Sequence, residues 1–78
     1  MPRLLLFAGL REIAGTSEIE IDAKTVGELV YKSCERFGND FSTIVDHSKI
    51  WLDGEETELT VPIFSNSEIA ILPPISGG

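Results

Sequence analysis

Two short apolar runs, one near each end of a 78-residue chain, constrain the fold more than any other feature of the sequence. Residues 4–8 form a continuous apolar run that Gly9 ends, and residues 68–72 form a second run rich in Ile and Leu. Periodicity alone does not separate a buried strand from a buried helix in runs this short. Their length, and the glycine after the first, favour strands that are covered on a face. Covered strands tend to lie centrally, so we predict that these two are neighbours in one sheet.

The segment between the two runs contains one clear amphipathic helix. Thr25 and Glu28 have capping-box spacing, and Gly38-Asn39 supplies a stop signal. Between these signals, apolar residues recur at helical spacing and form one stripe: Val26, Leu29, Val30, Cys34 and Phe37. Glu28 and Lys32 stand at i, i+4, which predicts a weak ion pair on the solvent face. A helix with a single apolar stripe has to cover one face of a sheet.

Shorter patterns indicate the remaining elements. Ile19 and Ile21 alternate with acidic residues, which is the period of a half-buried strand. Residues 10–14 predict a short helical turn that Gly15 closes, and residues 41–45 predict another. Residues 50–52 predict a strand.

Turn signals separate the later elements. The pair Asp53-Gly54 ends the strand at 50–52, and a charged, solvated segment follows with Glu55, Glu56 and Glu58. Ser65-Asn66-Ser67 is a second turn signal. We expect the two nearby aromatic residues, Trp51 and Phe64, in the core or half-exposed on the sheet.

These elements predict an α+β two-layer fold of the β-grasp type. The order is strand-strand-helix-turn-strand-strand, with one main helix covering one face of a small mixed sheet. A chain of 78 residues is one domain rather than two. We expect residues 1–72 to form the β-grasp domain and residues 73–78 to form a flexible, extended C-terminal tail.

Composition excludes several classes of function. The formal net charge of −7 repels phosphate backbones, which disfavours nucleic-acid binding and favours a partner with a basic rim. Cys34 is the only cysteine, so an internal disulfide and a zinc site of several thiols are excluded. The apolar run at residues 4–8 is far too short to span a bilayer. We therefore expect a cytoplasmic protein with no metal, membrane or nucleic-acid partner.

The last six residues, Pro73-Pro74-Ile75-Ser76-Gly77-Gly78, form the strongest candidate for a functional segment. The two prolines end the sheet and start an extended exit. Gly77 and Gly78 have no Cβ, so their backbone fits a narrow channel. This arrangement suits a carboxylate that is delivered to another protein's active site. A bare carboxylate is a poor electrophile, so transfer requires activation by ATP to an acyl-adenylate, followed by attack of a sulfur nucleophile.

Other chemically active side chains have simpler interpretations. Cys34 lies on the apolar stripe of the helix, so core packing is favoured over a role as a persulfide relay. His47 is the only histidine and has no Cys/His cluster around it, so a loop residue is favoured over a ligand or base. Arg11 and Glu12 are a surface pair that could also serve in docking.

Three stretches of the sequence resemble the ubiquitin-like sulfur-carrier family, and within it the small subunit of molybdopterin synthase. They are residues 7–15 (FAGLREIAG), residues 25–29 (TVGEL) and residues 68–78 (EIAILPPISGG). The resemblance implies that an E1-like adenylating enzyme activates Gly78 with Mg-ATP, and that a sulfur donor protein then supplies a C-terminal thiocarboxylate. It implies that this chain binds no cofactor of its own.

The same resemblance implies a partner and the residues that contact it. The tail would thread into the molybdopterin synthase large subunit, which carries the catalytic residues, in a heterotetramer of two carriers on a dimer of large subunits. The sulfur would complete the dithiolene of molybdopterin. Partner-binding positions implied by the resemblance are Phe7, Arg11, Leu72, Pro73, Pro74, Ile75 and Ser76.

The sequence leaves other functions open. The chain could carry sulfur to another acceptor, as in thiamine synthesis or tRNA thiolation. It could be a protein modifier that forms an isopeptide bond between Gly78 and a target lysine. It could also be a β-grasp interaction module whose last residues are incidental.

Overall fold

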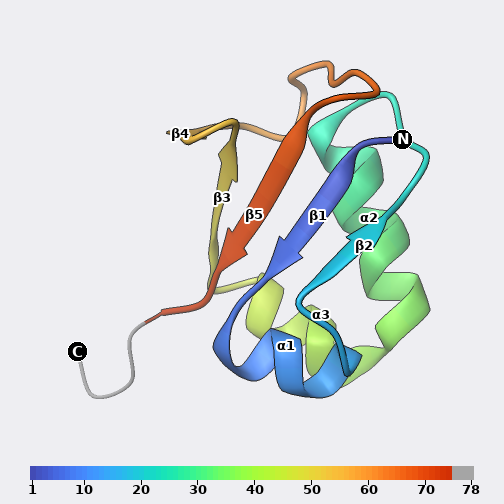
Figure 1. The fold of residues 1–78 in the computed structure, drawn as a ribbon. Helices are drawn as coiled ribbons and strands as arrows, with labels where there is room; N and C mark the ends of the chain where they lie inside the picture. The colour runs from blue at the N-terminus through green and yellow to red at the C-terminus, as the bar shows by residue number, and fades with distance from the viewer. Residues whose placement is uncertain (75–78) are drawn as a thin grey trace.

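The two apolar runs at the ends of the sequence lie side by side as parallel strands at the centre of a mixed sheet (Figure 1). They form β1 (Arg3–Leu6) and β5 (Glu68–Leu72) in a computed structural model that describes residues 1–74. The register pairs Leu4 with Ile69 and Leu6 with Ile71, and all four side chains are buried. The predicted pairing of the first and last strands is therefore confirmed.

Three further strands complete the sheet within the described residues, in the order β2-β1-β5-β3-β4. β2 (Glu18–Glu20) is antiparallel to β1, and β3 (Lys49–Leu52) is antiparallel to β5. Glu55, Glu56 and Glu58 are exposed, as predicted, but the sequence did not predict that β4 (Glu55–Glu56) pairs with β3 as an edge strand. Asp53 and Gly54 have φ of 49° and 89°, the left-handed pair that a tight hairpin requires, so the turn brings the acidic segment back.

The main helix, α2 (Val26–Phe37), has the predicted boundaries and cap. The backbone N–H of Glu28 donates to Thr25 Oγ1 at 3.1 Å, and Gly38 follows the helix with φ 93°. The predicted ion pair between Glu28 and Lys32 was wrong. The Glu28 carboxylate accepts from the backbone N–H of Lys24 at 2.6 Å, while Lys32 Nζ donates to the carbonyl of Asp22 at 2.6 Å.

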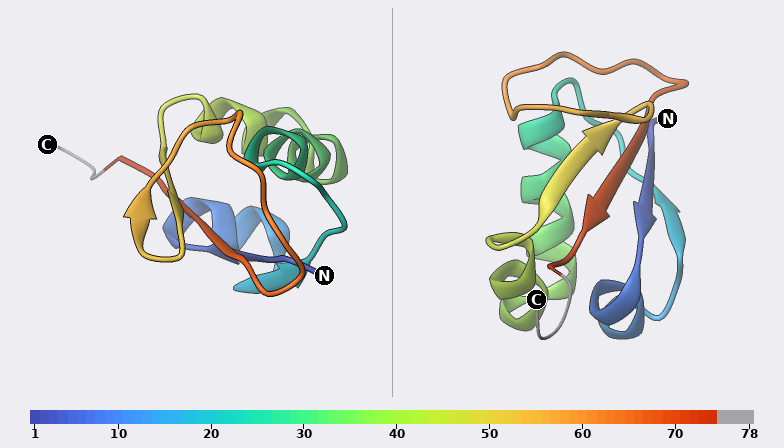
Figure 2. Two further views of the ribbon diagram at one scale, coloured as in Figure 1. Left: turned by 90° about the horizontal axis from the view of Figure 1, so that it is seen from above. Right: turned by 90° about the vertical axis from the view of Figure 1, so that its left-hand side faces the viewer.

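Two shorter helices lie on the same side of the sheet as α2 (Figures 1 and 2). α1 (Ala8–Ala14) begins two residues before the predicted turn and ends at Gly15, whose φ of 76° is left-handed. α3 (Asn39–Val45) covers the weak pattern at residues 41–45. Gly38 joins α2 directly to α3, so the chain reverses with no intervening loop.

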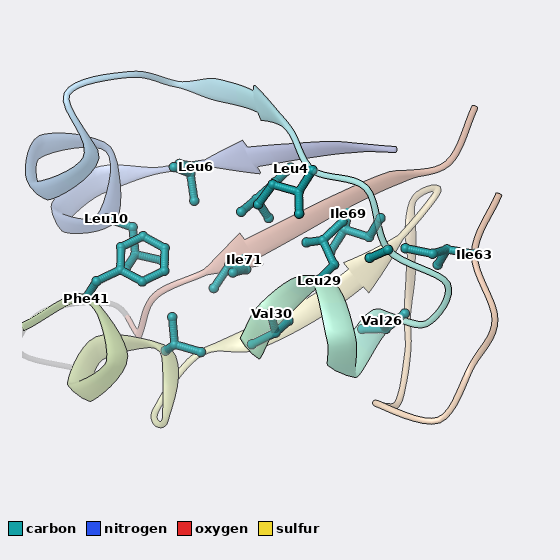
Figure 3. Close-up of a cluster of buried hydrophobic side chains, with 13 residues drawn as sticks. Leu4, Leu6, Leu10, Val26, Leu29, Val30, Phe41, Ile63, Ile69 and Ile71 are labelled. Atoms are coloured by element: carbon teal, nitrogen blue, oxygen red, sulfur yellow. The ribbon is translucent and has the colours of Figure 1, made fainter. Parts of the chain in front are cut away.

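The core lies between the helices and one face of the sheet (Figure 3). Phe41 from α3 and Leu10 from α1 close it at one end, and Ile63 closes it at the other. Trp51 on β3 is half-buried, as predicted, whereas Phe64 lies in a loop and is 68% exposed, so its predicted place in the core or sheet was wrong. The buried apolar side chains are Leu4, Leu6, Leu10, Ile21, Ala23, Val26, Leu29, Val30, Phe41, Val45, Ile63, Ile69 and Ile71.

Candidate functional site

The candidate site starts where β5 ends, because that strand leads directly into the proline pair. β5 is central, and its parallel neighbour β1 ends at the same edge of the sheet. Leu72 and Pro73 are half-buried and Pro74 is exposed. Since Ile69 and Ile71 anchor β5 in the core, the position at which the chain leaves the sheet is fixed by packing.

Phe7 stands beside this exit. Leu6 pairs with Ile71, and Phe7 and Leu72 are the next residues on the two chains. The Phe7 side chain is 41% exposed. The next residue, Ala8, has φ of 50°, a conformation that costs an L-residue about 1–2 kcal/mol. Such strain persists only where the surrounding structure imposes it. Here the turn from β1 into α1 imposes it, and an aromatic side chain is left partly in solvent at the edge where β5 ends.

Arg11 lies one helical turn after Phe7. Its backbone N–H donates to the carbonyl of Phe7 at 3.4 Å, and its side chain is exposed on α1. The structure therefore places Phe7, Leu72, Pro73 and Pro74 where β1 and β5 end, and Arg11 on α1, the helix that begins there. The other predicted site residues, Ile75, Ser76, Gly77 and Gly78, lie outside the described residues.

The sheet face opposite the helices carries an apolar strip that sequence reasoning did not predict as a site. The register places Leu5, Ala70 and Trp51 side by side across β1, β5 and β3, and Leu72 lies one step further along β5. All four side chains are half-buried, and no helix within residues 1–74 covers this face (Figure 2). The alternation of residues 68–72 indicates that Ala70 and Leu72 share one face of β5. Only the register shows that Leu5 and Trp51 lie beside Ala70 on that face.

Carboxylates surround this strip. Glu18 on β2, Glu56 on β4 and Glu68 on β5 share its face of the sheet. Arg3 lies between two of them, with its Nη1 3.1 Å from Glu18 Oε2 and its Nη2 paired with Glu68. Pairs this exposed contribute less than about 1 kcal/mol, so we interpret them as features of the surface potential. An apolar strip within an acidic rim is suited to a partner surface with the reverse pattern.

The alternative reactive residues are not part of this site. Cys34 is half-buried and packs against the core, which agrees with a structural role. His47 is exposed at the end of α3. Within residues 1–74, no group of three His, Cys, Asp or Glu side chains has the arrangement of a metal site. No helix in that part of the chain is long and apolar enough to cross a membrane.

Fold and site together define a class. A five-stranded mixed sheet packed against helices, whose central last strand leads toward a Gly-Gly ending, is the β-grasp architecture of the ubiquitin-like sulfur carriers and modifiers. The chain belongs to the ThiS family, whose model matches residues 4–78.

The chain is similar to proteins described as modifiers. Small archaeal modifier protein 1 of Haloferax volcanii is 32% identical, over 94% of this chain and 95% of the relative. A crystal structure of that protein superposes with a TM-score of 0.75, covering 99% of this chain and 98% of the other. The solution structure of small archaeal modifier protein 1 from Methanosarcina acetivorans gives a TM-score of 0.88 at 24% identity, covering 99% and 95%.

Two similar folds come from complexes. One is the BexX/CysO complex of Amycolatopsis orientalis, with a TM-score of 0.82 at 18% identity, covering 100% of both chains. The other is the complex of subunits 1 and 2 of molybdopterin-converting factor from Helicobacter pylori, with a TM-score of 0.71 at 19% identity, covering 99% and 97%. At these identities the likeness is one of fold.

Proposed function

We propose that this chain is a ubiquitin-like protein modifier that also carries sulfur, and that both activities use the carboxylate of Gly78. The observation that carries the proposal is the course of β5. Its buried Ile69 and Ile71 fix the strand, and the sequence then runs through Pro73-Pro74 to two final glycines. A folded domain whose sequence ends in two glycines can insert a carboxylate into another enzyme while its own fold stays intact.

The chemistry starts on an E1-like adenylating enzyme with Mg-ATP. The Gly78 carboxylate attacks the α-phosphate, an acyl-adenylate forms, and pyrophosphate leaves. In the modifier reaction a lysine ε-amine then attacks the carbonyl carbon, an isopeptide bond forms, and AMP leaves with loss of the amine proton. In the carrier reaction hydrosulfide attacks the same carbon, AMP leaves with loss of the sulfur-bound proton, and Gly78 carries a thiocarboxylate. Neither branch requires a catalytic side chain of this chain.

The apolar strip supplies the docking surface for these partners. Leu5, Ala70 and Trp51 are already half-buried on a rigid sheet, so an interface that covers them orders few side chains. The carboxylates around the strip favour an activating enzyme whose rim is basic, and such charge pairing accelerates the encounter. Phe7 and Leu72 extend the apolar surface to the edge from which Pro73 and Pro74 depart.

The near full-length similarity to an archaeal modifier favours the modifier reaction. The second candidate is the small subunit of molybdopterin synthase, which would bind the large subunit and deliver sulfur for the dithiolene. It is supported by the sequence stretches at residues 7–15 and 68–78, and by the fold shared with a chain of the Helicobacter pylori complex. Both candidates use Gly78, and they differ in the acceptor.

Intact mass spectrometry tests the shared step. The chain is incubated with an E1-like enzyme known to be active on its own carrier, with Mg-ATP and sulfide, and a chain that ends at Ser76 is the control. We expect a mass gain equal to the exchange of one oxygen for sulfur, absent from the control. The control keeps all of residues 1–74 and should unfold at the same temperature. If the full chain gains no mass, the carrier function is wrong.

The acceptor decides between the two candidates. A lysate supplied with the activated chain is digested and searched for lysines that carry the C-terminal residues of this chain. Branched peptides support the modifier. In a parallel reaction, a molybdopterin synthase large subunit and the cyclic precursor are added to the thiocarboxylate form. Dithiolene formation with no lysine conjugates would favour the synthase subunit instead.

A further inference from the structure

A second surface lies away from the edge where β5 ends. It is a cleft of about 320 Å³ between β2 and α2, lined by Met1, Glu20, Ile21, Asp22, Lys32 and Arg36. In Figure 1 β2 and α2 lie at the right, whereas β5 ends at the lower left. Of the residues that line the cleft, Glu20 also lies on the open face of the sheet, opposite Arg3 in the register. A ligand there would leave Phe7 and Leu72 free.

On the strand side of the cleft, the backbone N–H and C=O of Glu20 have no hydrogen-bond partner within residues 1–74. β2 is an edge strand of the described sheet. Two backbone bonds, Ile21 N–H to Pro2 C=O and Leu6 N–H to Ser17 C=O, show which residues of β2 hydrogen-bond to β1. Glu20 therefore sits in a non-hydrogen-bonded pair with Arg3, and its N–H and C=O point away from the sheet.

The two outward positions that flank Glu20 are already occupied. The Thr16 hydroxyl donates to the carbonyl of Glu18 at 3.1 Å, and Lys32 Nζ donates to the carbonyl of Asp22 at 2.6 Å. The carbonyls of Glu18 and Asp22 are therefore not free to pair with a long added strand, which protects this edge of the sheet against aggregation. A short extended peptide can still form two hydrogen bonds with Glu20.

The helix side of the cleft carries two cations, Lys32 and Arg36, and the strand side carries two carboxylates, Glu20 and Asp22. Lys32 and Arg36 are one turn apart on α2, and no ion pair joins either of them to a carboxylate within residues 1–74. Arg3 is the one Lys or Arg within residues 1–74 that forms an ion pair, so what distinguishes Lys32 and Arg36 is their position together on one wall of the cleft. The Arg36 guanidinium lies 5.6 Å from the centroid of the Phe37 ring, a contact that orients it. The apolar lining of the cleft comes from Ile21 and Met1.

We propose that this cleft binds a short extended peptide with an apolar residue and, two positions later, an acidic residue. Side chains two apart point to the same side of an extended chain, so both enter the cleft while the backbone pairs with Glu20. The apolar side chain contacts Ile21, and the carboxylate pairs with Lys32 and Arg36. Glu20 and Asp22 line the strand side, where the peptide presents its N–H groups, so the peptide carboxylate has to lie on the helix side, beside Lys32 and Arg36. The site is a recognition surface for partner proteins and does not depend on Gly78.

NMR titration of the full-length, ¹⁵N-labelled chain tests the proposal. The probe is the peptide acetyl-Ser-Leu-Thr-Glu-Ser-amide, in which Leu and Glu are two apart. We expect saturable amide shifts at Glu20, Ile21, Lys32 and Arg36, with Ala70 on the sheet face unchanged. The same peptide with Gln in place of Glu should bind about two- to fivefold more weakly for each cation contact it loses.

Matched variants separate the site from general charge attraction. Lys32→Gln combined with Arg36→Gln should weaken binding about tenfold, from two exposed charge contacts. Lys24→Gln removes one positive charge, as each single substitution of the pair does, from an exposed lysine that does not line the cleft, and it should change binding less than about twofold. The thermal midpoints of all variants confirm that they fold.

Four results would overturn the proposal. They are no shifts at millimolar peptide, shifts on the sheet face in place of the cleft, equal binding by the double variant, and the same shifts with inorganic phosphate alone.

Discussion

The strained turn at Ala8 yields a quantitative prediction. Ala8 has φ of 50°, which costs an L-residue about 1–2 kcal/mol and costs glycine almost nothing. Its side chain is exposed, so removal of the methyl group loses little packing. Glycine also raises the entropy of the unfolded chain, at a cost of about 0.5–1 kcal/mol. The net expectation for Ala8→Gly is a gain of about 0.5–1 kcal/mol in the free energy of unfolding.

Ala14, at the other end of the same helix, supplies the control. It has helical backbone and packs against the core, so Ala14→Gly should lose at least about 1 kcal/mol. Urea unfolding can be followed by fluorescence of Trp51, the only tryptophan. In thermal unfolding, Ala8→Gly should raise the midpoint by about 2–8 °C for a chain of this size.

The test compares the change in the free energy of unfolding in Ala8→Gly with that in Ala14→Gly. If Ala8→Gly loses as much stability as Ala14→Gly, Ala8 is not strained and the account of the turn is wrong. If it gains stability, adenylation supplies a second readout. Because glycine adopts the positive φ at residue 8 without strain, Phe7 should stay beside the exit of β5, and KM and kcat for the activating enzyme should not change.

Substitutions at three further positions test other parts of the structure. Gly27→Ala should destabilise the fold by about 1–3 kcal/mol although alanine favours helices, because its Cβ would lie 3.0 Å from the Leu59 carbonyl oxygen; a gain in urea midpoint would refute this. Asp53→Ala should cost about 1–3 kcal/mol, since it puts alanine at φ 49° and removes the 2.9 Å bond from the Glu68 N–H to Asp53 Oδ1. Asp53→Asn should keep most of that stability, and equal losses in the two variants would contradict the account. Leu5→Asp should raise KM in the adenylation assay about tenfold or more while the protein remains folded, and an unchanged KM would remove the apolar strip from the docking surface.

Local signals made much of the fold predictable. The capping box at Thr25, the apolar stripe and the stop at Gly38 fixed α2 to the residue, because each acts over one or two turns of chain. The central pairing of β1 with β5 was also predictable, since two short apolar runs in a small chain have few places to be buried. The acidic strand β4 was not predicted, because backbone pairing there outweighs side-chain character.

Part of the candidate site was predictable and part was not. The proline pair and the glycines are written in the sequence, and the resemblance named Phe7, Arg11 and Leu72, which the fold places where β1 and β5 end and on α1, the helix that begins there. The strip formed by Leu5, Ala70 and Trp51 was not visible, because its members come from three strands separated by most of the chain. Only the register decides that they share a face.

The sequence by itself determined the secondary structure of α2, the burial of the first and last strands, and the nature of the last residues. These follow from periodicity, capping and composition, which are properties of neighbouring residues. Tertiary structure alone decided which face of the sheet stays open, that Ala8 is held at a positive φ, and that Lys32 and Arg36 face the edge of β2 across a cleft. Those features depend on contacts between residues far apart in the chain, and such contacts exist only after the β-grasp has closed.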